Sequence, residues 1–212
     1  MTDTVIVMVP GALMSPQDFL AAGFDKALAQ HWPEAVLVAA SIDVNQLDSD
    51  ACVATLHDQL VAIIATYPQH RLILGGISLG AAVSMQYARQ HPAHIHGLCL
   101  LAPYPGSRIT TQAIRTAGGP ATWRPTEAQN GDAEFLLWHW MIQGHGELPV
   151  YIGYGRSDRF ADGQGLMAEA MPAAMHHFVD GDHDWPTWQM LWQDFVARRP
   201  FAEPAAAFEG EH

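Results

Sequence analysis

The stretch LILGGISLGAAVSM, residues 72–85, joins a short apolar run to a helix-like segment through a turn that is crowded with glycine. Within it, Ser78 has a glycine two residues away on each side, Gly76 and Gly80. A serine hydroxyl that protrudes from a sharp strand-to-helix turn crowds its neighbours, and glycine at these two positions relieves that crowding. The stretch therefore predicts a strand, an exposed serine and a helix, which is the beginning of an α/β unit.

Along the rest of the chain, short runs rich in Val, Ile and Leu alternate with segments of helical periodicity. The predicted strands are 4–9, 35–41, 71–76, 97–102, 148–154 and 174–179. The predicted helices are 16–31, which opens on Ser15 and Pro16, 50–66, which Asp48 or Ser49 would cap, 79–90, 128–143, 163–171 and 186–198. This alternation is typical of an α/β fold with a parallel sheet and helices on both faces.

The length and the continuous alternation predict a single domain at 1–199. The alternation breaks at 103–127, where proline, glycine and threonine are frequent. Together with the helix that follows, this segment forms an excursion at about 103–146, which we expect to lie like a short lid over the carboxyl ends of the strands. Residues 200–212 offer little to bury and are expected to form a flexible tail.

Charge and composition argue against several classes of partner. The formal net charge is −12, from 22 acidic and 10 basic side chains, so we expect no nucleic-acid partner. No apolar run approaches the roughly 18 residues of a membrane span, and Asp3 stands where a secretory signal would be positive, so a cytoplasmic location is expected. Cys52 and Cys99 are predicted to be small buried thiols. The oligomeric state stays open.

Two later segments supply the partners that a serine nucleophile needs. GYGRSDRF, residues 153–160, places Asp158 after the fifth predicted strand, and GDHDWPTW, residues 181–188, places His183 after the sixth. The carboxyl ends of parallel strands meet at one edge of a sheet, so Ser78, Asp158 and His183 are expected to converge there. A histidine in this position activates the hydroxyl, and an acid orients the histidine.

Other residues compete for these two roles. Asp162 and Asp180 are the next candidates for the acid, because both lie close to the expected site. His176 and His177 are the rivals for the base, but both fall inside the sixth predicted strand, where packing is the simpler interpretation.

Metal binding is a further alternative for the histidines. His94 and His96 form an HxH pair, but they precede a strand and so belong to the sheet edge away from the expected site. His139 and His145 also lack the spacing of a zinc site. We therefore predict no metal and no cofactor.

The motifs GISLG, GRSD and GDHDW, in the chain order Ser, Asp, His, resemble those of α/β-hydrolases, and among them the small serine esterases of the carboxylesterase type. The resemblance covers nearly all of residues 4–199. It implies a minimal sheet of about six mainly parallel strands, without the two antiparallel N-terminal strands that larger relatives often carry, and without a large cap. It also implies that Ser78, Asp158 and His183 form a catalytic triad.

The same resemblance implies an oxyanion hole made of backbone N–H groups. Leu79 would supply one donor, and the first loop would supply the other from Ala12, with Leu13 in reserve. Many relatives carry His-Gly in this loop, where the present chain has Pro10 and Gly11. Glycine still permits close approach of the backbone.

Aromatic and apolar residues around the expected site suggest a substrate pocket formed by Tyr104, Trp138, Met141 and Trp185. Trp188 and Trp192 follow Trp185 at helical spacing and are interpreted as packing residues.

The predicted function is hydrolysis of a small-molecule carboxylic ester with a neutral or apolar acyl group, through an acyl-enzyme. The alternatives are a thioesterase, a lysophospholipase or an amidase with the same triad, and a hydrolase-fold protein that binds a ligand without turning it over. A dinucleotide-dependent reductase is disfavoured, because VPGALMS after the first strand lacks the GxGxxG turn.

Overall fold

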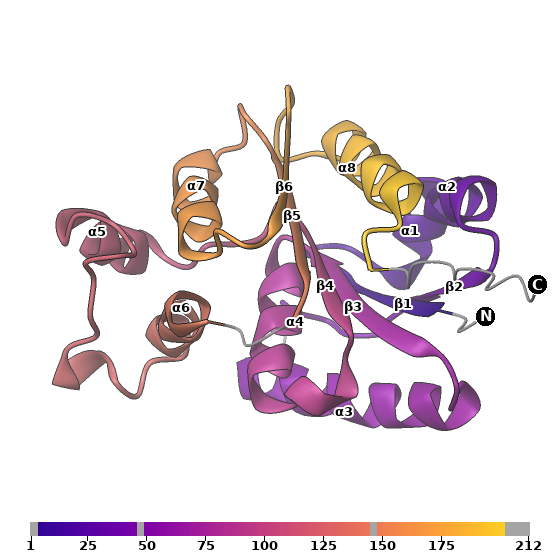
Figure 1. Ribbon diagram of the computed structural model, residues 1–212, viewed down its shortest axis with the longest axis horizontal. Helices are drawn as coiled ribbons and strands as arrows, with labels where there is room; N and C mark the ends of the chain where they lie inside the picture. The colour runs from indigo at the N-terminus through magenta and orange to yellow at the C-terminus, as the bar shows by residue number, and fades with distance from the viewer. Residues whose placement is uncertain (1–3, 46–48, 145–147, 202–212) are drawn as a thin grey trace, which may run out of the picture.

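A computed structural model describes residues 4–45, 49–144 and 148–201 of the chain. Across these residues, six strands form one sheet in the order β2-β1-β3-β4-β5-β6, and every neighbouring pair is parallel (Figure 1). The strands are β1 (Thr4–Val9), β2 (Ala35–Ala39), β3 (Arg71–Ile77), β4 (Gly97–Leu101), β5 (Val150–Gly155) and β6 (Met175–Val179). The predicted six-stranded α/β fold is confirmed.

Helices cover both faces of the sheet. One face carries α1 (Pro16–Ala21), α2 (Phe24–His31) and α8 (Trp185–Arg198), and the other carries α3 (Ser49–Thr66), α4 (Leu79–Gln90), α6 (Ala133–Gln143) and α7 (Ala161–Ala170). The remaining helix, α5 (Arg108–Thr116), and the short 3₁₀ turns η1 (Pro92–His94) and η2 (Glu127–Gln129) lie in connections. Figure 1 shows α2 beside α8 on one side of the strands and α3 with α4 on the opposite side.

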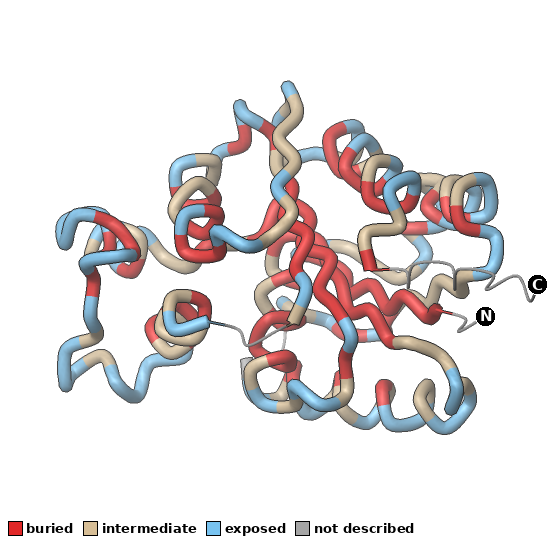
Figure 2. Tube along the Cα trace, viewed as in Figure 1, coloured by how far each residue is buried: buried red, intermediate tan, exposed pale blue. Residues whose placement is uncertain are grey.

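The two-residue period of the strands explains the two layers. In β1, Val5, Val7 and Val9 join the core under α3 and α4, whereas Ile6 and Met8 join the core under α1, α2 and α8. All six residues of β1 are buried, as expected for a central strand covered on both faces. Figure 2 shows the burial concentrated along the strands.

Three elements differ from the sequence prediction. The predicted helix 16–31 is two helices, because Gly23 adopts a left-handed φ of 77° and turns the chain between them. The predicted helix 128–143 begins only at Ala133, where the Asp132 side chain accepts hydrogen bonds from the first free N–H groups. The excursion also contains α5, whose N-terminus Ser107 caps. This helix was not predicted from the sequence because proline and glycine are frequent around it.

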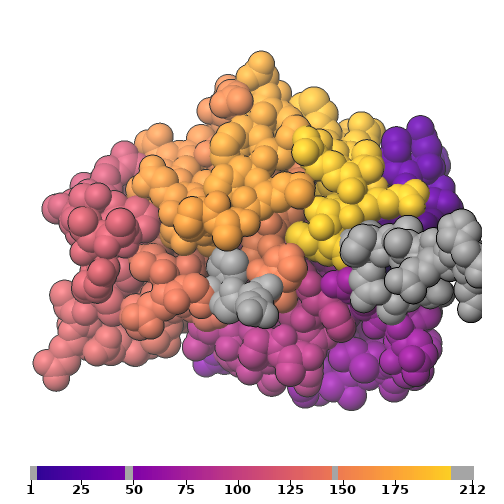
Figure 3. All heavy atoms as spheres, in the orientation of Figure 1, coloured from indigo at the N-terminus to yellow at the C-terminus, as the bar shows by residue number. Residues whose placement is uncertain are grey.

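The excursion forms a lobe at one side of the molecule, with α5 and α6 stacked beside the sheet (Figures 1 and 3). Its position follows from its anchors at the carboxyl end of β4 and the start of β5. The chain passes from β1 outward to β2 and then returns to β3 on the other side of β1. Loops that leave β1 and β3 therefore diverge at the carboxyl edge, which is where open α/β sheets place their ligands.

Most of the predicted tail, residues 202–212, lies outside the described residues. The same holds for Asp48, a predicted cap of α3, and for His145. Phe201 is buried against Phe195. Both cysteines are buried and neither is part of a disulfide, as predicted. Among the helices that the structure describes, none is both long enough and apolar enough to cross a membrane.

Candidate active site

Ser78 lies on a strained turn between β3 and α4. Its φ of 54° and ψ of −117° are unusual for a residue with a side chain. A Cβ at Gly76 would collide with the backbone of Gly80, and a Cβ at Gly80 would collide with the carbonyl group of Val9. The two glycines are therefore required for β3, α4 and β1 to approach one another closely enough to form this turn.

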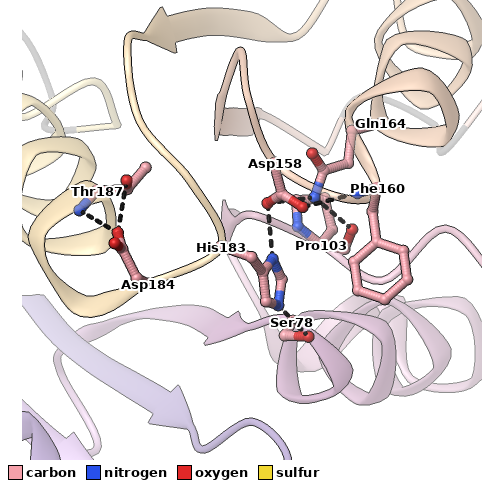
Figure 4. A network of polar contacts seen from close by, with 8 residues as sticks. All are labelled: Ser78, Pro103, Asp158, Phe160, Gln164, His183, Asp184 and Thr187. Atoms are coloured by element: carbon pink, nitrogen blue, oxygen red, sulfur yellow. Dashed lines mark hydrogen bonds and ion pairs between the residues drawn. The ribbon is translucent and has the colours of Figure 1, made fainter.

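The structure brings the three predicted catalytic residues together in one hydrogen-bonded chain (Figure 4). His183 Nε2 lies 3.0 Å from Ser78 Oγ, and His183 Nδ1 lies 2.6 Å from Asp158 Oδ2. They come from loops after β3, β5 and β6. The side chain of Asp158 is fully buried and that of His183 is 9% exposed, which keeps most water away from the contact between acid and base.

Asp158 is held as an anion by its neighbours. Burial raises its pKa, but the hydrogen bond from His183, the N–H of Phe160 at 2.8 Å, the charge of His183 and the side chain of Gln164 at 3.2 Å together lower it below its usual value. Gln164 also donates to the carbonyl oxygen of Pro103 and so ties α7 to the loop after β4. An ionised Asp158 requires His183 to present Nδ1–H to it, which leaves Nε2 free to accept the serine proton.

Two aromatic rings fix the plane of the His183 imidazole. Phe160 meets it edge to face at a centroid distance of 5.2 Å, and Trp188 does so at 5.3 Å from another direction. Trp188 therefore does more than the helix packing predicted for it. Trp185, predicted as a pocket residue, instead packs edge-on against Phe19 and Phe24 in the core under α8. It belongs to that core because the first turn of α8 directs it toward α1 and α2.

The rival residues have other partners. Exposed Asp162 pairs with Arg115 at 3.4 Å, and exposed Asp180 pairs with Arg156 at 3.5 Å. In β6, the His176 ring contacts the carbonyl oxygen of Met171, and His177 Nδ1 lies 3.6 Å from Asp194. To form a triad with Ser78, any of these four rival residues would first have to break the contacts just described.

The loop after β1 lies directly against the serine turn. A Cβ at Gly11 would stand 2.9 Å from the carbonyl oxygen of Ile77 and 3.4 Å from Ser78 Cβ, so only glycine permits this approach. Beyond it, Ala12 is exposed, and Leu13 has a left-handed φ of 59° with its side chain 91% exposed. Leu79 begins α4, and the first N–H groups of a helix have no partner within it. The loop after β1 therefore lies against the turn that carries Ser78 and against the first turn of α4.

An apolar cavity of about 220 Å³ opens beside Leu79. Tyr104, Trp138 and Met141, three of the four predicted pocket residues, line it. Trp138 Nε1 donates to the carbonyl oxygen of Pro105 at 2.9 Å, which fixes the indole as a wall. Glu134 accepts hydrogen bonds from Ser107 N, at 2.8 Å, and from Thr110 Oγ1, and so ties α6 to the start of α5.

On the other side of Tyr104, Pro105 and Gly106 lies a larger and more polar groove of about 730 Å³. Arg108, Arg115 and Arg159 line it together with Phe160, the ring that contacts His183. The segment 104–106 therefore separates an apolar compartment, which Leu79 lines, from a polar one, which Phe160 lines.

Candidate metal ligands lie elsewhere. Within the described residues, the one set of three or more such side chains in close proximity is His57, His91 and His94. It lies at the opposite edge of the sheet, where α4 ends and β4 begins. His96, the other histidine of the HxH motif that the sequence disfavours as a metal site, does not belong to this set, and its Nδ1 accepts a hydrogen bond from the N–H of Leu72.

Sequence reasoning missed Gln164, Phe160 and Trp188. Gln164 lies six residues beyond Asp158 on α7, a polar side chain with no exposed surface, and helical spacing would have placed it near the site. Phe160 lies two residues beyond Asp158, just after the GRSD turn, but no sequence pattern separates a ring that contacts an imidazole from one that packs in the core.

Comparison with known proteins gives a consistent family. A family model described as the alpha/beta hydrolase fold matches residues 18–136, more than half of the chain. The match includes Ser78 and ends before Asp158 and His183, so the last two residues rest on the geometry alone. No curated protein sequence matches the chain.

Several solved structures share the fold at low sequence identity. Est1E from Butyrivibrio proteoclasticus is 13% identical with a TM-score of 0.69, over 94% of this chain and 87% of its own. The fluorophosphonate-binding serine hydrolase FphF of Staphylococcus aureus is 9% identical with a TM-score of 0.67, over 92% and 83%. A thioesterase domain from the curacin biosynthetic pathway is 13% identical with a TM-score of 0.61, over 92% and 91%.

Proposed function

The chain belongs to the alpha/beta hydrolase fold family, and on that premise we propose that it is a serine hydrolase that cleaves carboxylic esters with short apolar acyl groups. The observation that carries the proposal is the hydrogen-bonded chain from Ser78 Oγ through His183 to Asp158, at 3.0 and 2.6 Å. A serine, a base and an ionised acid in this order are what acyl transfer requires.

In the proposed reaction, Ser78 Oγ attacks the ester carbonyl carbon while His183 Nε2 takes the hydroxyl proton. The tetrahedral intermediate places its negative oxygen between the N–H groups of Leu79 and Ala12, with Leu13 as the alternative second donor. When the carbon–oxygen bond to the alcohol breaks, His183 returns the proton to the leaving oxygen. Water then attacks the acyl-enzyme with His183 again as base, and this releases the acid and restores Ser78. Asp158 keeps its charge throughout and stabilises the imidazolium.

The two compartments beside the serine suggest how an ester would be divided between them. The apolar cavity of about 220 Å³ suits the acyl chain, and the wider polar groove suits the leaving alcohol. Pockets for drug-sized ligands begin at about 300 Å³, so a cavity below that size favours a short acyl chain over a long one.

A series of p-nitrophenyl acetate, butyrate, octanoate and decanoate tests this proposal. We expect the wild type to prefer the two short esters in kcat/KM, and Ser78→Ala to lower kcat by about 10⁴-fold or more. Cysteine at this position would serve as a control for folding, because it keeps the shape and leaves a nucleophile. Full activity in Ser78→Ala, or no turnover of any ester by the wild type, would refute the proposal.

A further inference from the structure

Three histidine rings are stacked at the end of the molecule opposite Ser78. His57 comes from the middle of α3, His91 ends α4, and His94 lies in η1 just before β4. The His57 and His91 rings are stacked at a centroid distance of 4.6 Å, and those of His91 and His94 at 5.4 Å. One ring nitrogen from each residue lies within 4.8 Å of the other two.

The hydroxyl group of Tyr87 orients two of these rings. It lies 2.9 Å from His94 Nδ1 and 3.3 Å from His57 Nδ1, and the residue itself is fully buried. Burial raises the pKa of Tyr87 to about 12, so the hydroxyl stays neutral. Metal-binding histidines usually have one ring nitrogen hydrogen-bonded to a neighbouring group, which orients the ring and leaves the other nitrogen for the metal ion.

The remaining contacts of the cluster leave room for a ligand. The side chain of His91 makes ring stacking contacts but no hydrogen bond with any of the described residues, and all three side chains are partly exposed. Imidazole nitrogen is a common metal ligand, so the side chain of His91 can serve as one.

We propose that His57, His91 and His94 form a binding site for one divalent transition-metal ion, of which Zn²⁺ fits best. Imidazole nitrogen suits Zn²⁺, Cu²⁺ and Ni²⁺, whereas Mg²⁺ and Ca²⁺ require oxygen ligands. Three histidines with a water in the fourth position satisfy tetrahedral Zn²⁺. Zn–N bonds of about 2.1 Å require the three nitrogens to lie about 3.4 Å apart. Rotation of the partly exposed side chains would bring the nitrogens, now within 4.8 Å of one another, to this separation.

The ion would act as a structural clamp and take no part in ester hydrolysis. Helix α4 has 12 residues, so its far end lies about 18 Å along the axis from Ser78. The three ligands belong to α3, the end of α4 and the turn before β4, so one ion would join three segments that pack on the same face of the sheet. No local sequence motif indicates this set of histidines, because His57 lies 34 residues before His91.

Titration calorimetry with Zn²⁺ on tag-free protein, first treated with a chelator, tests the site. We expect one ion per chain, no binding of Mg²⁺, and a rise in melting temperature of about 5 °C or more at saturating Zn²⁺. His91→Phe keeps the stacked ring but removes the ligand nitrogen, so we expect about tenfold weaker binding or more and no rise in melting temperature.

Matched variants separate this site from other histidines. His57→Gln should weaken Zn²⁺ binding as His91→Phe does. Two controls should bind one Zn²⁺ as the wild type does: His96→Ala, which is next to the cluster but outside it, and His183→Ala, which is at the proposed active site. Wild-type protein that binds no Zn²⁺, or His91→Phe and His57→Gln proteins that bind it unchanged, would overturn the proposal. If only His183→Ala abolished binding, the ion would belong to the triad and the proposal would be wrong.

Discussion

Histidine side chains lie near both ends of helix α4, His183 near its beginning and the cluster of His57, His91 and His94 near its end, and the two sets have different partners. At its beginning, His183 is held between Ser78 and the buried anion Asp158, and two aromatic rings fix its plane. At its end, His57 and His94 share the neutral hydroxyl of Tyr87, and the His91 ring is stacked against both of them. The same side chain is thus prepared for proton transfer at one edge and for ligand binding at the other.

The groups that contact a histidine therefore indicate its role better than the residue type alone. A buried carboxylate beside an imidazole stabilises its protonated form, which a general base needs after it has taken a proton. Three imidazoles that face one another can instead direct ring nitrogens toward a shared ligand. Function at each edge can therefore be tested by removing one partner and leaving the other edge intact.

The largest effect is expected from the loss of the base at the serine edge. His183→Ala should lower kcat for p-nitrophenyl butyrate by about 10⁴-fold or more, because the serine loses the group that takes its proton. Steady-state kinetics measures it. The control is His96→Ala at the opposite edge, which should change kcat by less than about twofold. Comparable losses in both variants would mean that the two edges are not functionally distinct.

Removal of the acid should have a slightly smaller effect. Asp158→Asn keeps the shape but presents an amide to His183 Nδ1, which favours the wrong tautomer and should lower kcat by about 10³- to 10⁴-fold. Asp180→Asn, the matched change at an exposed acid nearby, should leave the rate unchanged. If the two variants had interchanged effects, Asp180 and not Asp158 would orient the base.

A modest effect on specificity is expected from the apolar cavity. Met141→Ala enlarges the compartment beside Leu79 and should shift the preferred ester toward longer acyl chains, with a roughly tenfold change in the octanoate-to-butyrate ratio of kcat/KM. Met171→Ala is the matched control, because Met171 is equally buried but follows α7 at the opposite edge. It should lower stability without a change in this ratio. An unchanged ratio in Met141→Ala would place the acyl chain in the polar groove.

The strands and the serine turn were predictable because local rules determine them. Strand β1 spans 4–9 as predicted, since six consecutive apolar or β-branched residues leave little choice for a buried strand. The convergence of Ser78, Asp158 and His183 also followed from strand order and position, without any contact being known in advance. The break at Gly23 and the helix α5 escaped prediction because they depend on how turns pack against neighbouring elements.

Contacts across long separations were the least predictable. Trp188 and Trp185 have the same side chain at neighbouring turns of α8, and only the position of the helix on the sheet decides which one meets His183. The histidine cluster joins residues 57, 91 and 94 through the packing of α3 on α4, which no motif encodes. In the sequence, His94 stood out only through the HxH motif with His96, and this motif was not expected to bind a metal.

The most direct test of the central claim, that Ser78 is the activated nucleophile of this chain, is covalent labelling with a fluorophosphonate followed by peptide mapping. The account predicts one adduct per chain, on Ser78, with none in Ser78→Ala and labelling slowed at least about a hundredfold in His183→Ala. An adduct on another residue, or wild-type protein that stays unlabelled, would contradict it.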